Sequence, residues 1–73
     1  MNVSITYCTK WNYLPRASGL EAELVEKFAA DVEIIPGASG VYDIVVDGSL
    51  IFSKKEKGRF PEDGEIARLC RED

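Results

Sequence analysis

The chain has 73 residues, of which 45% are hydrophobic and 30% are charged, and its net charge at neutral pH is −4. This length fits one small domain with a thin core, which excludes a deep, enclosed active site. The acidic balance argues against nucleic acid or an anionic membrane as the main partner, and no apolar run is long enough to span a membrane. Because no charged segment followed by an apolar stretch opens the sequence, we expect a cytoplasmic protein with reduced cysteines.

The first half of the chain predicts a strand, a helix and a second strand. Residues 3–7 alternate between apolar and polar side chains, as in a half-buried strand. A helix is expected next, with Asn12 as its N-cap and Pro15 in its first turn. Its apolar residues recur at helical spacing: Ala17, Leu20, Leu24, Val25 and Phe28. Residues 32–35 read as a short strand that ends at Pro36.

The second half predicts a hairpin and a final helix. Residues 41–46 and 49–53 form two strands around Asp47-Gly48, the strongest turn signal in the chain. Residues 54–59 are expected to form a charged loop. A last helix then begins at Pro61, with an acidic first turn that contains Glu62, Asp63 and Glu65. The order βαβββα predicts a two-layer α/β fold with a four-stranded mixed sheet. Its first two strands run parallel through a right-handed crossover, and the third lies antiparallel beside the first.

The hairpin turn also predicts which side chains share a face. A two-residue turn pairs Val46 with Ser49, Val45 with Leu50, Ile44 with Ile51 and Asp43 with Phe52. The face that carries Asp43 should look outward, because an unpaired buried carboxylate is costly. Both helices would then cover the other face. The open face would keep an apolar patch of Val45, Leu50 and Phe52, suited to a protein partner or a second copy of the chain. An ordinary edge hairpin with scattered apolar residues explains these positions equally well.

Histidine is absent, which removes the common general base, the common metal ligand and every Ser-His or Cys-His arrangement. No spacing of cysteines and carboxylates resembles a zinc site, so we expect neither a metal nor a bound cofactor. The chemistry must come from other side chains.

Cys8 is the strongest candidate for a functional residue. It stands where the first strand gives way to the first helix, and the positive end of a helix favours a thiolate. Lys10 follows two residues later, and the topology brings the loop of residues 54–59 to the same edge of the sheet. The basic side chains of that loop would favour the thiolate and attract carboxylates: Lys54, Lys55, Lys57 and Arg59.

Each of these residues also has a structural interpretation. Cys8 could be a small buried hydrophobe at the end of a strand. The basic loop could be a solvated hairpin end. Trp11 could cover Cys8, anchor the first turn of the helix or stack on a ligand. Cys70 follows Ile66 and Leu69 at helical spacing, which favours a place in the core over a role as a resolving partner for Cys8.

The sequence resembles the selenoprotein W-like (Rdx) family over nearly its whole length. The resemblance is carried by residues 7–13 (Tyr-Cys-Thr-Lys-Trp-Asn-Tyr), residues 36–42 (Pro-Gly-Ala-Ser-Gly-Val-Tyr), Asp47-Gly48, Ser53-Lys54-Lys55 and Gly58-Arg59-Phe60-Pro61. It implies a single thioredoxin-like βαβββα domain over residues 1–73 and a thiol oxidoreductase linked to glutathione. Cys8 matches the first cysteine of the family's Cys-x-x-Cys motif, whereas Trp11 stands at the position of the second, which gives a Cys-x-x-Trp motif.

Two functions follow as hypotheses. The first is a thiol-based redox protein that uses Cys8 alone. In this hypothesis Cys8 forms a mixed disulfide with glutathione or a protein thiol, and glutathione serves as co-substrate in a glutathione-linked oxidoreductase. The alternative is a thioredoxin-like module without catalysis, which binds a protein partner through the open sheet face or the loop that carries Trp11.

Overall fold

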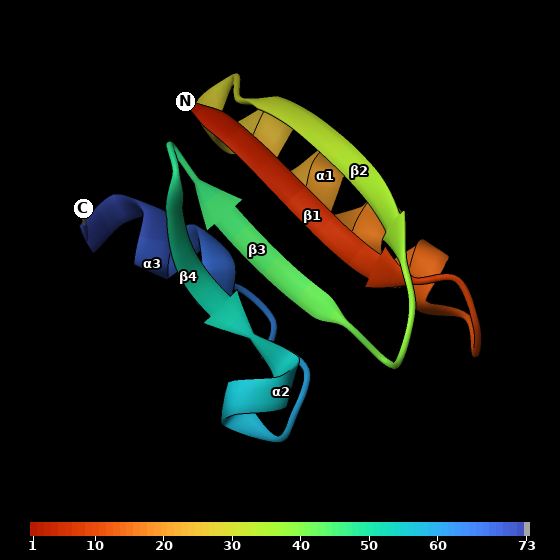
Figure 1. Ribbon diagram of the computed structural model, residues 1–73. Coiled ribbons are helices and arrows are strands. Elements are labelled where there is room, and N and C mark those ends of the chain that lie inside the picture. The colour runs from red at the N-terminus through yellow and green to blue at the C-terminus, as the bar shows by residue number, and fades with distance from the viewer. Residues whose placement is uncertain (73) are drawn as a thin grey trace.

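The computed structural model describes residues 1–72 and shows one four-stranded sheet with strand order β2-β1-β3-β4 (Figure 1). The elements are β1 (Asn2–Cys8), α1 (Tyr13–Phe28), β2 (Asp31–Gly37), β3 (Tyr42–Val46), β4 (Ser49–Ser53), α2 (Lys54–Lys57) and α3 (Glu65–Glu72). As predicted, β1 runs parallel to β2 and antiparallel to β3, and β3 pairs antiparallel with β4. The mixed four-stranded sheet is confirmed.

Two helices cover one face of this sheet. Figure 1 shows α1 behind β1 and β2, and α3 behind β4. The helix α1 contacts both of these strands and also α3, which completes a two-layer arrangement. The core between the layers takes the alternate residues of the central strands, including the fully buried Ile5 and Ile44. From α1 it takes Tyr13, Ala17, Leu20 and Leu24.

The β3–β4 hairpin contains a bulge that the sequence did not predict. The first two pairs, Val46 with Ser49 and Val45 with Leu50, are confirmed. The register then shifts, so that Ile44 opposes Phe52 and Asp43 opposes Ser53, and Ile51 becomes the extra residue. The predicted pairs of Ile44 with Ile51 and Asp43 with Phe52 were therefore wrong. A bulge adds one residue to a strand and reverses the alternation of faces beyond it.

The bulge moves Phe52 from the open face into the core. Its side chain is only 1% exposed, so Phe52 is not part of an open-face patch. Leu50 remains on the surface with 49% exposure, and Val45, its partner in the ladder, is half-buried. The open face thus carries a smaller apolar area than the predicted three residues.

The segment after β4 also differs from the prediction. Residues 54–59 were expected to form a loop, but Lys54–Lys57 form the short helix α2 at the sheet edge where β1 ends (Figure 1). Gly58 closes this helix in a left-handed conformation with φ of 73°, and its N–H donates to the Lys54 carbonyl at 2.7 Å. A glycine at this position ends a helix without the steric cost that a side chain would bring.

The last helix begins later than expected, at Glu65 and not at Pro61. Gly64 has a φ of 80°, which is outside the helical region and keeps the preceding residues in a turn. The second strand is longer than expected and runs through Pro36 to Gly37. Proline is tolerated there because β2 lies at the edge of the sheet.

Candidate functional site

Cys8 ends β1 at the point where three segments of chain meet. Its backbone N–H donates to the Val41 carbonyl at 2.8 Å, and the Thr9 N–H donates to the Gly37 carbonyl at 3.3 Å. Gly37 is also the register partner of Cys8 in the parallel pair. The connection between β2 and β3 therefore flanks Cys8.

The Cys8 side chain is closed to solvent in this conformation. It is 1% exposed and belongs to the hydrophobic core, which also includes Tyr13 and Tyr42. The structural interpretation, a small buried hydrophobe at the end of a strand, thus describes its surroundings. A reaction at the sulfur requires the segment that covers it to move.

Residues 9–12 link Cys8 to α1 and hold two strained residues in a row. Trp11 has a φ of 58° and Asn12 a φ of 62°, both in the left-handed region. This conformation costs an ordinary residue about 1–2 kcal/mol, and asparagine tolerates it better than tryptophan. The Asn12 side chain makes no capping hydrogen bond, although Asn12 occupies the predicted N-cap position. The first turn of α1 therefore lacks a side-chain cap.

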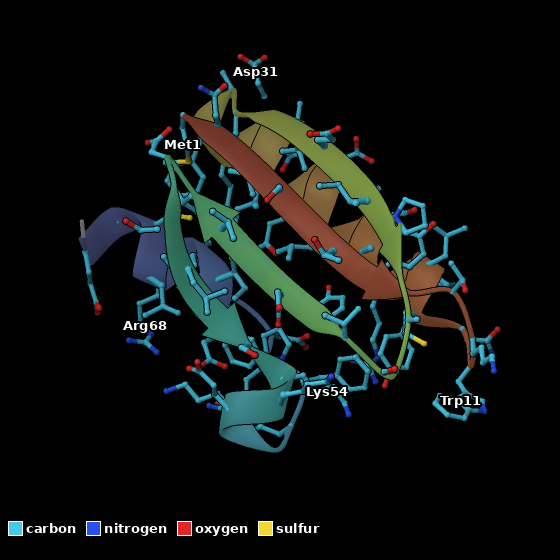
Figure 2. The ribbon with its side chains drawn as sticks, viewed as in Figure 1. Met1, Trp11, Asp31, Lys54 and Arg68 are labelled. Carbon is cyan, nitrogen blue, oxygen red and sulfur yellow. The ribbon has the colours of Figure 1, made fainter. Side chains whose placement is uncertain are left out.

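Trp11 points into solvent. It is 75% exposed, and Figure 2 shows it at the outer tip of the loop, away from Lys54. Trp11 thus neither covers Cys8 nor anchors the first turn of α1. Of its predicted roles, only stacking on a ligand or partner is compatible with this exposure.

The predicted basic residues do not form one patch. Lys54 approaches the start of α1, where its Nζ lies 5.9 Å from the Tyr13 ring centroid. Arg59 turns the other way and forms a two-pronged ion pair with Glu65, with nitrogen–oxygen distances of 2.7 and 3.0 Å. Within residues 1–72, no hydrogen bond or ion pair joins Cys8 to Lys10, Lys55 or Lys57, which are all exposed.

The Arg59 ion pair has a clear electrostatic signature. Its hydrogen bond lowers the pKa of Glu65 to about 2, and the Glu62 N–H, which donates to Glu65 Oε1 at 2.9 Å, acts in the same direction. The charge of Arg59 is therefore neutralised by α3. Arg59 is a fixed part of the scaffold and not a free cation near Cys8.

An aromatic cluster of Tyr13, Tyr42 and Phe60 lies next to this edge of the sheet. The three rings meet edge to face, with centroid distances of 4.9 Å (Tyr13–Phe60), 5.3 Å (Tyr42–Phe60) and 6.3 Å (Tyr13–Tyr42). Burial raises the pKa of Tyr42 to about 12, although the nearby charge of Arg16 acts in the opposite direction. The sequence did not predict this cluster.

Two cationic side chains contact the Phe60 ring of this aromatic cluster. The Arg16 guanidinium carbon lies 4.0 Å from the Phe60 ring centroid, and the Lys54 ammonium lies 5.3 Å from the same centroid. Both distances fall within the range of cation–π attraction. The spacing of Tyr13 and Arg16, three residues apart on one helix, places them on one face and was the only local signal of this arrangement.

A surface groove opens beside the cluster, between α1 and residues 60–66. Its volume is about 650 Å³. Arg16, Gly19 and Leu20 line one wall, and Phe60 and Ile66 line the other. Cys8 is not among the residues that line it, so the groove and the thiol are separate features.

Cys70 lies in α3 and is 6% exposed, which confirms its predicted place in the core. Figure 1 shows α3 behind β4, away from the end of β1 that carries Cys8. The two sulfur atoms are not joined by a disulfide bond. This arrangement gives no support to Cys70 as a resolving partner for Cys8.

Residues 1–72 contain neither a cluster of metal ligands nor a helix that could span a membrane. No three histidine, cysteine, aspartate or glutamate side chains in this part of the chain converge in a way that could hold a metal ion. None of its helices combines the length and the apolar character that crossing a membrane requires.

The chain is similar to known proteins over nearly its whole length. A family model described as the Rdx family matches residues 2–72. A selenoprotein W-related protein from Vibrio cholerae superimposes with a TM-score of 0.88 and 27% identity, over 97% of this chain and 92% of that protein. A protein from Bordetella parapertussis superimposes with a TM-score of 0.91 and 30% identity, over 97% and 94% of the two chains.

A mouse protein, migration and invasion enhancer 1, is 25% identical over 72 residues. The match covers 97% of this chain but only 63% of the mouse protein. The chain thus spans less than two thirds of that relative.

Proposed function

The chain belongs to the Rdx family, and on this premise we propose that it is a thiol-based redox protein that acts through Cys8. The observation that carries the proposal is the position of Cys8. It ends a strand directly before a loop with two left-handed residues, and that loop leads into a helix without a side-chain cap. Strained backbone of this kind is concentrated at functional sites.

The burial of Cys8 makes the reaction depend on a local opening. We infer that residues 9–12, which follow Cys8 directly and carry the strained Trp11 and Asn12, are the connection that moves, because an opening there would release that strain. Once exposed, the sulfur becomes accessible at the point where β1 leads through residues 9–12 to the start of α1. The opening therefore supplies access to the thiol.

The chemistry uses one protein thiol and one reduced glutathione per cycle. The Cys8 thiolate attacks the glutathione sulfur of a mixed disulfide between glutathione and a substrate protein, takes up the glutathione as a new mixed disulfide and releases the thiolate of the substrate. A reduced glutathione then attacks the glutathione sulfur held by Cys8, which regenerates the Cys8 thiolate and releases oxidised glutathione. The substrate protein is thereby reduced and glutathione is oxidised. Oxidised glutathione can also load Cys8 in the first step, releasing one glutathione thiolate. The resemblance that places Trp11 at the second motif position implies this one-thiol route.

The cycle needs a pool of reducing thiols, and we therefore place the protein in the cytoplasm. No resident cofactor takes part, since glutathione enters and leaves as a co-substrate.

The test is intact-mass analysis after incubation with oxidised glutathione at neutral pH, with the modified cysteine mapped by peptide analysis. We expect one glutathione per chain, attached at Cys8. Cys8→Ser should remain unmodified, whereas Cys70→Ser should react like the natural chain. A folded protein that stays unmodified at Cys8, while the unfolded chain reacts, would overturn the proposal.

A second function is favoured by a different observation, the contrast between a sealed Cys8 and an exposed Trp11. Cys8 is 1% exposed and Trp11 is 75% exposed. A large exposed ring is a typical anchor in protein interfaces. The chain would then be a thioredoxin-like binding module that uses the Trp11 loop, with Val45 and Leu50 on the open sheet face as a further contact area for a partner or a second copy. A Cys8→Ser variant with full partner binding, beside a Trp11→Ala variant without it, would favour this function.

A further inference from the structure

The groove between α1 and residues 60–66 has the dimensions of a ligand site. Its volume of about 650 Å³ lies within the range of about 300–1,000 Å³ that is typical of small-molecule pockets. Gly19 stands in the wall that α1 contributes, in the middle of the helix. A Cβ atom built on Gly19 would meet no atom within 4 Å, so the space over this residue is open.

Arg16 offers an unsatisfied cation at one end of this groove. Its guanidinium lies on the Phe60 ring, and within residues 1–72 it forms no ion pair, whereas Lys27, Arg59 and Arg68 each have a carboxylate partner. A guanidinium stacked on a ring keeps its edge N–H groups available, and two of them match the two oxygens of a carboxylate. Lys54 adds a second positive charge near the same ring.

The opposite wall limits which anions can enter. Glu62 and Asp63 line the groove, and neither forms an ion pair within residues 1–72. Farther along α1, Glu23 and Lys27 neutralise each other at 2.9 Å. The groove is therefore positive at Arg16 and negative along residues 62–63. A polyanion such as a nucleotide would be repelled there more strongly than a single carboxylate, because the repulsion grows with the charge of the ligand.

The remaining lining is apolar or open. Leu20, Phe60 and Ile66 line the groove together with Gly19. We propose that this groove binds small molecules with one carboxylate on an apolar body. Arg16 holds the carboxylate, and the apolar body lies over Gly19 and against Leu20. This site is separate from Cys8, and its occupation requires no chemistry at the thiol.

The test is an NMR titration of the full chain with octanoate, with octanol and inorganic phosphate as probes that each lack one of the two features. We expect saturable shifts of the Gly19 and Phe60 amide signals with octanoate. Binding of octanol or phosphate should be at least roughly 10-fold weaker, because a charge-assisted hydrogen bond or an apolar contact is lost.

Two variants separate the site from general effects of mutation. Arg16→Gln should weaken octanoate binding roughly 10- to 100-fold, the loss expected for a two-pronged charged contact. Arg71→Gln, the same change at an exposed position outside the groove, should leave binding unchanged. Gly19→Leu should block the groove while keeping every charge, and leucine is a better helix former than glycine, so a loss of binding would not reflect unfolding.

Non-saturable shifts, or equal binding by the natural chain, Arg16→Gln and Gly19→Leu, would overturn the proposal. Equal binding of phosphate and octanoate would also overturn it, because the groove would then select charge alone. The titration does not depend on the oxidation state of Cys8. A negative titration therefore does not contradict the redox proposal, and a failure to modify Cys8 does not contradict ligand binding in the groove.

Discussion

Replacing Trp11 with glycine should slow the reaction of Cys8, although glycine usually loosens a loop. Trp11 is in the left-handed region, with a φ of 58°, and its side chain is 75% exposed. Glycine enters this region without steric cost, so the closed loop becomes more stable relative to the open one. The Cys8 thiol then spends less time exposed.

The size of the effect follows from two opposing terms. A non-glycine residue pays about 1–2 kcal/mol for the left-handed conformation. Glycine avoids this cost but loses about 0.5–1 kcal/mol more in conformational entropy when the loop closes. At the midpoints of the two ranges, the net stabilisation of the closed loop is about 0.75 kcal/mol, which lowers the population of the open loop by roughly 2- to 5-fold.

The comparison should be made between Trp11→Gly and Trp11→Ala, because both remove the ring and only one relieves the strain. The assay is the rate of Cys8 alkylation under native conditions, with peptide mapping to separate Cys8 from Cys70. We expect Trp11→Gly to react roughly 2- to 5-fold more slowly than Trp11→Ala. Equal rates, or faster alkylation of the glycine variant, would show that strain at residue 11 does not control the opening.

Three further predictions concern the scaffold. Phe52→Ala should cost about 3–5 kcal/mol in the free energy of unfolding in urea, whereas Leu50→Ala should stay within about 0.5 kcal/mol; similar costs would contradict the bulged register. Because Arg59 lowers the pKa of Glu65 to about 2, the stabilisation is present above the ordinary pKa of 4.5 and is lost as the pH falls toward 2. In Glu65→Gln, the urea concentration at the midpoint of unfolding should therefore fall less as the pH is lowered from 4.5 toward 2. An equal fall in the variant and the natural chain would argue against the ion pair. Because burial raises the pKa of Tyr42 to about 12, its stabilisation is lost as the pH rises from 10 toward 12, and Tyr42→Phe should remove that loss; a tyrosinate absorbance step near pH 10 for Tyr42 would contradict its burial.

The regular parts of the fold could be predicted because local patterns determine them. The alternation of apolar and polar side chains in residues 3–7 predicted β1. The Asp47-Gly48 turn predicted the first two residue pairs between β3 and β4. The bulge could not be predicted in this way. Ile51 and Phe52 are adjacent and both apolar, so either could fill the core, and packing of the larger ring against the helices decides between them.

The site was predictable in position but not in exposure. The sequence places Cys8 between a strand and a helix, but its burial depends on the whole surrounding core, including residues 37–41, which are distant in sequence and form hydrogen bonds with Cys8 and Thr9. The aromatic cluster was missed for the same reason, because Tyr13, Tyr42 and Phe60 come from three separate segments. The fate of Arg59 likewise depended on Glu65, which lies at the start of α3 and whose contact with Arg59 no local pattern predicted.

The most direct test of the central claim is the rate of Cys8 modification at increasing, sub-denaturing concentrations of urea. If residues 9–12 open locally, the mapped rate at Cys8 should exceed the rate allowed by global unfolding, and it should change little with urea because little surface is exposed. A Cys8 rate that equals the global limit and rises with the full urea dependence of unfolding would contradict the account. In that case the thiol would react only in the unfolded chain.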